Sequence, residues 1–242
     1  MVINTTKTKS MLITTQQRHR HLQDTKLTIK VNNQELKQVT SEKLLGVVLD
    51  ENLHWREHVN RVYKKITSNL ALLRRIKQYL PQWSRIMFYN AYIMPHLDFC
   101  VTVWGNCSDM TKLLKLQKQA ARIILDCNIM TPSNEMFNKL KWLPIQEWVR
   151  YRKANMMYKA MNHKTPDYIS NMFQPLSSVH KRDTRQSENC NLYLPPRAKL
   201  NVFRNSLRYS GADIWNNLPT NIRNAPSVAV FKNRYFEMYF NE

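Results

Sequence analysis

Basic side chains at helical spacing are the residues of this sequence whose types and positions could do chemistry. They recur every three or four residues on two segments, opposite the apolar positions of the same segments. They are Arg61, Lys64 and Lys65 on the first segment and Lys112, Lys115, Lys118 and Arg122 on the second. Ammonium and guanidinium groups bind phosphate oxygens through charge and reach, without sequence-specific geometry. The alternative for any one stripe is a solvated helix face.

The charge balance of the whole chain favours a polyanionic partner. The 242 residues include 37 Lys and Arg against 17 Asp and Glu, which gives a formal net charge of +20 at pH 7. An excess of this size is typical of proteins that bind nucleic acid. We therefore expect a duplex held through its phosphates, with an affinity that falls steeply as the salt concentration rises.

The remaining polar residues predict neither a catalytic centre nor a metal site. Only 3 Gly are present, so the sequence excludes a glycine-rich phosphate loop. Two-metal phosphoryl transfer needs clustered carboxylates, whereas only Asp50 and Glu51 are adjacent here. The 4 Cys include no Cys-x-x-Cys pair of the zinc-binding kind. We expect no catalytic residue, no bound metal and no cofactor in this chain.

The composition also limits the compartments in which we expect the protein. Hydrophobic residues make up 43% of the chain, enough for a real core, which excludes a disordered basic tail. No apolar run approaches the ~20 residues of a membrane span, and residues 1–10 lack a secretory signal. Few cysteines favour a reducing compartment. We expect an intracellular protein of the nucleus or cytoplasm that is not secreted and has no membrane partner.

Short strands are predicted up to residue 50. The apolar centre of Ser10–Thr14 predicts a brief extended run, and alternating polarity predicts a strand at Lys26–Val31 with Glu35–Val39 as its partner. Asn32 and Asn33 predict a two-residue turn between these two partners, because Asn tolerates positive φ. The apolar run Leu44–Leu49 is typical of a strand buried on both faces. These segments predict a small sheet.

Helical periodicity begins at about His54. The first helix is expected to end before Pro81, and the second, from about Ser84, is apolar nearly all round and is expected in the middle of a core. The later helices are predicted from Ser108 or Asp109, from Thr131 to about Lys141, from Ile145 to before Thr165, and at the carboxyl end with Phe231 and Tyr235 inward. Residues 177–191 are typical of a linker or exposed loop.

Several segments, taken in order, resemble one family of proteins. They are Asn4–Met11, Lys43–Asp50, Leu53–His58, Tyr89–Leu97, Val103–Gly105, Leu116–Arg122, Ser210–Pro219 and Phe231–Lys232. They are similar to the carboxyl-terminal part of reverse transcriptases of non-long-terminal-repeat retrotransposons, of the LINE class with jockey-like elements. The resemblance extends over nearly the whole chain, although no single segment is as specific as a catalytic signature.

The resemblance implies an α+β fold that is mostly α. Residues 1–50 would be a small antiparallel β remnant of the palm, 51–165 a thumb-like helical bundle, and 166–242 a helical carboxyl-terminal region. The thumb would hold the RNA template–DNA primer duplex, and Lys7 and Lys9 would lie near the primer end. The fingers and the rest of the palm would be partners of this part in the full-length enzyme.

The resemblance also implies that the catalytic residues of the enzyme would lie in another part of the full-length protein. The family's catalytic aromatic-Ala-Asp-Asp motif would precede residue 1, and no Asp occurs here before Asp24. We therefore expect Mg²⁺ only for a full-length polymerase, and a fragment that binds duplex without polymerising DNA. Two alternatives stay open, which are a domesticated helical protein-interaction module and the product of a decayed reading frame that does not fold alone.

Overall fold

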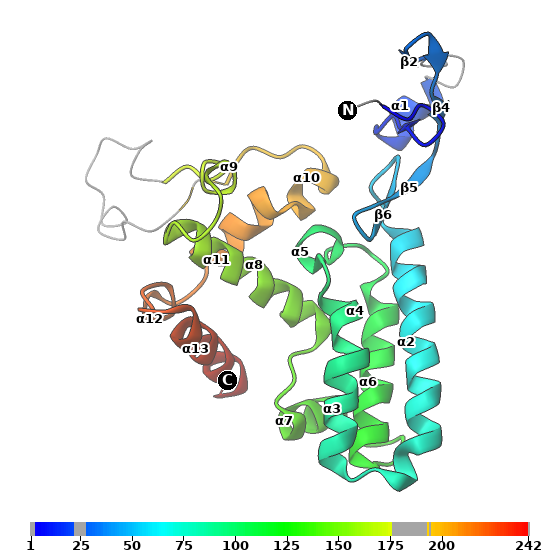
Figure 1. Ribbon diagram of the computed structural model, residues 1–242. Coiled ribbons are helices and arrows are strands. Elements are labelled where there is room, and N and C mark those ends of the chain that lie inside the picture. Colours follow the sequence, from blue (N-terminus) through cyan, green and yellow to red (C-terminus); the bar gives the residue numbers. More distant parts are fainter. Residues whose placement is uncertain (1–2, 22–27, 176–192, 194, 242) are drawn as a thin grey trace, which may run out of the picture.

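The computed structural model describes residues 3–21, 28–175, 193 and 195–241. The predicted linker at 177–191 and residues 26 and 27 of a predicted strand lie outside these ranges. Figure 1 shows a bundle of long helices, short strands above one end of it, and a second group of helices that α8 joins to the bundle. The fold is α+β and mostly helical, as the sequence predicts. The division at residues 50 and 165 stays a prediction.

The bundle is built from the helices that follow the strands. In chain order these are α2 (Arg56–Ile76), a 3₁₀ turn (Lys77–Tyr79), α3 (Gln82–Tyr92), α4 (Met94–Asp98), α5 (Val101–Trp104), α6 (Met110–Leu125) and α7 (Ser133–Leu140). Helices α2 and α6 lie side by side (Figure 1). One ion pair joins Arg56 to Asp109 at their starts and another joins Lys77 to Asp126 at their ends, so the two helices run in the same direction. The predicted helix after His54 is confirmed. Its buried residues are His58, Val59, Val62, Ile66, Leu70 and Leu73.

The carboxyl-terminal half consists of one long helix and several short ones. They are α8 (Ile145–Met161), α9 (Asp167–Ser170), α10 (Asn201–Asn205), a π-helical turn (Leu207–Gly211), α11 (Ala212–Asn216), α12 (Thr220–Arg223) and α13 (Val228–Asn241). The predicted terminal helix is confirmed, with Phe231 and Tyr235 buried. Among the described residues, no helix combines the length and the apolar composition that a membrane span requires.

Two large apolar clusters meet on α8. Ile145 and Val149 belong to the cluster inside the bundle, whereas Ala154 and Met157 belong to the cluster beneath α11 and α13. Trp148 packs against both clusters. This helix is buried nearly all round, so it joins the two halves through its side chains as well as its backbone.

The strands are shorter than the sequence predicts. They are β1 (Lys9–Ser10), β2 (Lys30–Val31), β3 (Gln34–Glu35), β4 (Lys37–Gln38), β5 (Ser41–Leu44) and β6 (Val47–Asp50), and a short helix α1 (Gln16–His21) lies between the first two. They form three separate two-stranded ladders, of which β1–β4 is parallel and the other two are antiparallel. The expected turn at Asn32 and Asn33 is confirmed, with φ of 51° and 60°. The strand expected at 11–14 is wrong, because these residues pair with no strand.

The apolar run Leu44–Leu49 is a hairpin and not one strand. Leu45 and Gly46 have φ of 46° and 94°, so the chain reverses in the middle of the run and β6 pairs back onto β5. Leu44 and Leu45 are 57% and 89% exposed as a result, whereas Val47 is buried. Hydrophobicity alone does not reveal a turn at a glycine within a run of apolar residues, because the residues before and after the turn are equally apolar.

The prediction that α3 lies in the middle of a core is also wrong. Only Tyr89 of this helix is buried, and Trp83, Met87 and Tyr92 are 58 to 64% exposed. The helix packs on α2, α4 and α6 along one side, and no described element covers its opposite side. The apolar side chains on this opposite side of α3 are therefore exposed at the protein surface.

Candidate nucleic-acid interface

The three predicted cations of α2 lie on the solvent side of the bundle. Arg61, Lys64 and Lys65 are all exposed. An α-helix turns by about 100° per residue, so Arg61 and Lys65 share one side, with Lys64 beside them. The buried residues Val59, Val62 and Ile66 interleave with them on the opposite face.

The predicted stripe of α6 is present, but its four charges differ in environment. Lys112 and Lys115 are exposed, whereas Lys118 and Arg122 are half-buried. The Lys112 ammonium lies 3.1 Å from a carboxylate oxygen of Asp109, which also pairs with Arg56. Lys115 and Lys118 have no ion pair among the described residues. The stripe therefore keeps a net positive charge opposite the buried face of α6.

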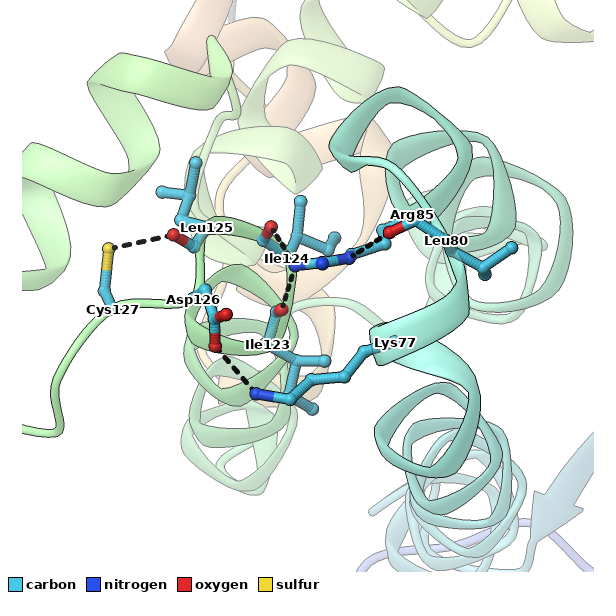
Figure 2. A network of polar contacts seen from close by, with 8 residues as sticks. All are labelled: Lys77, Leu80, Arg85, Ile123, Ile124, Leu125, Asp126 and Cys127. Carbon is cyan, nitrogen blue, oxygen red and sulfur yellow. Dashed lines mark hydrogen bonds and ion pairs between the residues drawn. The ribbon is translucent and has the colours of Figure 1, made fainter.

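Several other cations of the bundle are occupied in holding it together. Figure 2 shows that Lys77 pairs with Asp126 at 2.7 Å, beyond the end of α6. Arg85 of α3 donates to the carbonyl oxygens of Ile123 and Ile124, which end the same helix. Cations stabilise the carboxyl end of a helix, where carbonyl groups lack partners. Lys77 also lowers the pKa of Asp126 by a hydrogen bond and by its charge.

Two basic residues of α8, Arg152 and Lys153, are likewise structural. Arg152 makes a bidentate pair with Asp98, which also accepts from the indole N–H of Trp148 at 2.7 Å. Arg150 pairs with Glu147 at 3.3 Å. Lys153 is fully buried. Arg152 and Lys153 therefore contribute to the formal charge of the chain without offering a free phosphate-binding group, whereas Arg150 stays exposed.

Lys7 and Lys9 lie apart from the helical cations, in the strand region. Lys7 is exposed, and its backbone N–H donates to Asn4. Lys9 pairs with Glu42, and this hydrogen bond lowers the pKa of Glu42. A phosphate at Lys9 would compete with a carboxylate, whereas a phosphate at Lys7 would not.

One pocket brings two of the predicted cations together with residues that the sequence did not single out. It lies where the β5–β6 hairpin meets α2 and α4 and has a volume of about 210 Å³. Its lining residues are Lys43, Gly46, His58, Arg61, Val62, Lys65, His96 and Phe99. Three of these are permanent cations, two are imidazoles and none is a carboxylate. Lys64 and the α6 stripe are not part of it.

The two histidines of this pocket respond to the cations around them. Burial and the charge of Arg61 lower the pKa of His58, and burial and the charge of Lys65 lower the pKa of His96. Both imidazoles are therefore held neutral by their surroundings at pH 7. His58 Nδ1 accepts the backbone N–H of Val48 at 3.3 Å, so the ring proton is on Nε2. No described group accepts that proton.

Sequence reasoning missed Lys43 and His58 as members of a site for a physical reason. Lys43 belongs to a hairpin that the apolar run concealed, and His58 occupies a buried position of α2. The close fit of the hairpin against α4 depends on Gly46, where an added Cβ would lie 2.9 Å from the ring of Phe99. Only the chain reversal at this glycine places Lys43 beside α2.

The described residues form no group of three or more metal-binding side chains. The cysteines among them, Cys100, Cys107 and Cys127, are free thiols. Burial raises the pKa of Cys107. Its thiol is therefore not an activated nucleophile. The chemistry that the described groups support is the electrostatic binding of anions.

Comparison with known proteins gives one weak and partial similarity. No protein-family model matches the chain, and no solved structure matches it. The chain is 23% identical over 153 residues to a probable RNA-directed DNA polymerase from transposon X-element of Drosophila melanogaster. The match covers 57% of this chain and 17% of that protein, so the chain corresponds to a small part of that relative. The similarity supports a relation to the reverse transcriptases of transposons over that part of the chain.

Proposed function

We propose that this chain is the carboxyl-terminal part of a LINE-type, jockey-like reverse transcriptase and that its helical bundle grips a template–primer duplex. The observation that carries the proposal is the basic stripe of α6, which faces away from the core. Arg74 of α2 reaches across to Gln119 of α6 at 3.2 Å, so the two helices present a continuous solvent side. The partial similarity to a transposon polymerase supports the same function.

The physical basis of this grip is charge without base recognition. The exposed lysines have long, mobile side chains that follow a phosphate backbone, and none of the exposed stripe residues is held in a geometry that reads a base edge. A duplex bound in this way is recognised by its charge and shape. Template and primer sequences of any composition would therefore bind with similar affinity.

The amino-terminal segment supports the idea of a part that belongs to a larger sheet. Its strands are mostly two residues long, and Ile13, Leu44 and Leu45 expose more than half of their surface. Short ladders with exposed apolar side chains are what a palm sheet would leave without its neighbouring strands. We propose that these side chains contact the remaining palm in a full-length enzyme.

The duplex proposal is tested by charge reversal on α6. The triple variant K112E/K115E/K118E should bind a fluorescent RNA–DNA hybrid roughly 100-fold more weakly than the unchanged chain, and the slope of log K against log salt should fall by about 0.9 for each lost phosphate contact. Fluorescence anisotropy over a salt series measures both quantities. Arg122 is left in place because its Nε is buried without a hydrogen-bond partner, so its replacement would confound binding with stability.

A matched control removes the same charge elsewhere. The variant K164E/R197E/K199E changes three exposed cations outside α2 and α6 and should keep most of the affinity. Equal losses in the two variants would show that only net charge matters and would contradict a grip by α6. An affinity that hardly changes between low and moderate salt would contradict phosphate binding altogether.

A protein-interaction module is the second candidate, and the outer face of α3 favours it. Trp83, Met87 and Tyr92 form an apolar surface on a helix of the bundle. The same charge-reversal variant separates the two functions. An apolar interface would survive the loss of the α6 charges, whereas duplex binding would not.

A further inference from the structure

The pocket between the β5–β6 hairpin, α2 and α4 differs from the open stripe on α6. Its cations are gathered around a cavity of about 210 Å³ and not spread along a helix. Lys43, Arg61 and Lys65 have no ion pair among the described residues. Like charges held this close repel one another, and the lining offers no carboxylate to offset them.

The buried floor of the pocket provides a second, independent observation. His58 is only 4% exposed, and its Nε2 has no hydrogen-bond partner. A buried polar group that lacks a partner costs free energy, about 1–3 kcal/mol. Its other ring nitrogen is held by the N–H of Val48 in the hairpin, so the orientation of the imidazole is set by the strand that forms the wall. The pocket thus combines unpaired cations with an unpaired buried donor.

We propose that this pocket binds a single phosphate group. Lys43 of β5 and Arg61 and Lys65 of α2 would neutralise the oxyanion from two elements of the pocket wall, and the imidazoles of His58 and His96 would line it. The volume accommodates a phosphate together with part of its hydration water, because each water takes up about 30 Å³ of the liquid. A phosphodiester of a nucleic-acid strand and a free phosphate present the same chemistry to the site.

The assignment of the occupant to a strand rests on the proposed function, whereas the affinity of the pocket for phosphate does not. The pocket lies on α2, a helix of the bundle that is proposed to hold the duplex. A strand that enters it would be held at one phosphate more tightly than along the open stripe, because three cations converge there.

The pKa values of the two pocket histidines should respond directly to a bound phosphate. A bound anion favours the protonated imidazole, so the pKa of His58 and His96 should rise when phosphate replaces chloride at equal ionic strength. NMR titration of the imidazole ring protons in the full chain measures each pKa. We expect a rise of at least about 0.5 for both.

Two variants make the test specific. R61Q/K65Q, at two exposed positions of α2, should fold normally and lose the phosphate-dependent rise at His96 and most of it at His58. K64Q/K115Q removes the same charge from exposed positions outside the pocket and should keep the rise. Identical titrations in phosphate and chloride, or an unchanged rise in R61Q/K65Q, would overturn the proposal.

A third arm distinguishes the source of the phosphate. An RNA–DNA hybrid at low salt that raises both pKa values in the absence of free phosphate supports a strand in the pocket. A response to inorganic phosphate alone, with the duplex bound elsewhere, supports the pocket and overturns the strand as its occupant. The response to inorganic phosphate is independent of the α6 charge-reversal experiment, so failure of the duplex grip and failure of the pocket are distinguishable.

Discussion

Lys153 shows that a charge counted in the sequence does not have to face solvent. Its ammonium is fully buried in α8 and donates to the carbonyl oxygen of Asn205 at 2.8 Å and to Oγ of Ser210 at 2.6 Å. Neither of these partners is a carboxylate, and burial lowers the pKa of Lys153 to about 8. The residue attaches the π-helical turn to α8 at the cost of desolvating a cation.

A lysine with a depressed pKa in the folded chain makes stability depend on pH. Between pH 8 and the ordinary pKa of 10.5, the unfolded chain binds more protons at this residue, so the free energy of unfolding should rise with pH. The expected gain from pH 8 to 9.5 is about 1.5 kcal/mol relative to the variant K153M, which lacks the group. Urea denaturation across this range measures it. The window stops before the tyrosines Tyr89 and Tyr235, whose raised pKa values act in the opposite direction.

The half-buried Lys159 of the same helix supplies the control for this prediction. K159M should follow the pH dependence of the unchanged chain, because this variant keeps the buried ammonium of Lys153. A K153M variant with the same pH dependence as the unchanged chain would show that Lys153 titrates normally. The sequence alone could not have distinguished the two lysines, because the partners of Lys153 lie more than 50 residues away.

At the scale of elements, the contact between α5 and α8 depends on one glycine. Gly105 follows the buried Trp104, whose indole N–H donates to the carbonyl oxygen of Phe99 at 2.8 Å. A Cβ at position 105 would lie 2.4 Å from the carbonyl oxygen of Val101 and 2.6 Å from Val149 of α8. Its φ is an ordinary −68°, so this glycine is required by space and not by backbone conformation.

The variant G105A should therefore destabilise the bundle. We expect a loss of about 1–3 kcal/mol in the free energy of unfolding, because backbone and a packed valine must both move. Urea denaturation followed by tryptophan fluorescence measures it. The variant G211A is the comparison, since its Cβ would approach only flexible side-chain atoms of Leu207 and Met157, at 3.1 Å or more, and its loss should be smaller. Equal midpoints for G105A and the unchanged chain would contradict this account of the packing.

For the molecule as a whole, stability should be distributed unevenly along the chain. The two large apolar clusters bury residues of α2, α6, α8 and α13, whereas the described strand region contributes only Val47 to them. Amides open more easily where few apolar contacts are buried. Hydrogen exchange should be slowest in α2, α6 and α8 and fastest in residues 28–44. Protection of residues 28–44 equal to that of α6 would show that the strands form a stable unit by themselves.

The sequence by itself determined the longer helices and the existence of the basic stripe on α6. Periodicity, proline and charge spacing are local properties, so Pro81 and Pro132 delimit helices as predicted and the stripe lies opposite the buried face of α6.

Only the tertiary structure decided which charges are free and where the apolar surplus lies. Arg152 pairs with Asp98, which is 54 residues away in the chain, and Lys77 pairs with Asp126, which is 49 residues away. Helix α3 exposes the side that no described neighbour covers. The pocket of Lys43, Arg61 and Lys65 exists because a glycine turn brings a hairpin against α2 and α4. The physical reason is that the partner of a side chain depends on contacts between distant segments, and the local spacing of residues in the sequence does not indicate these contacts.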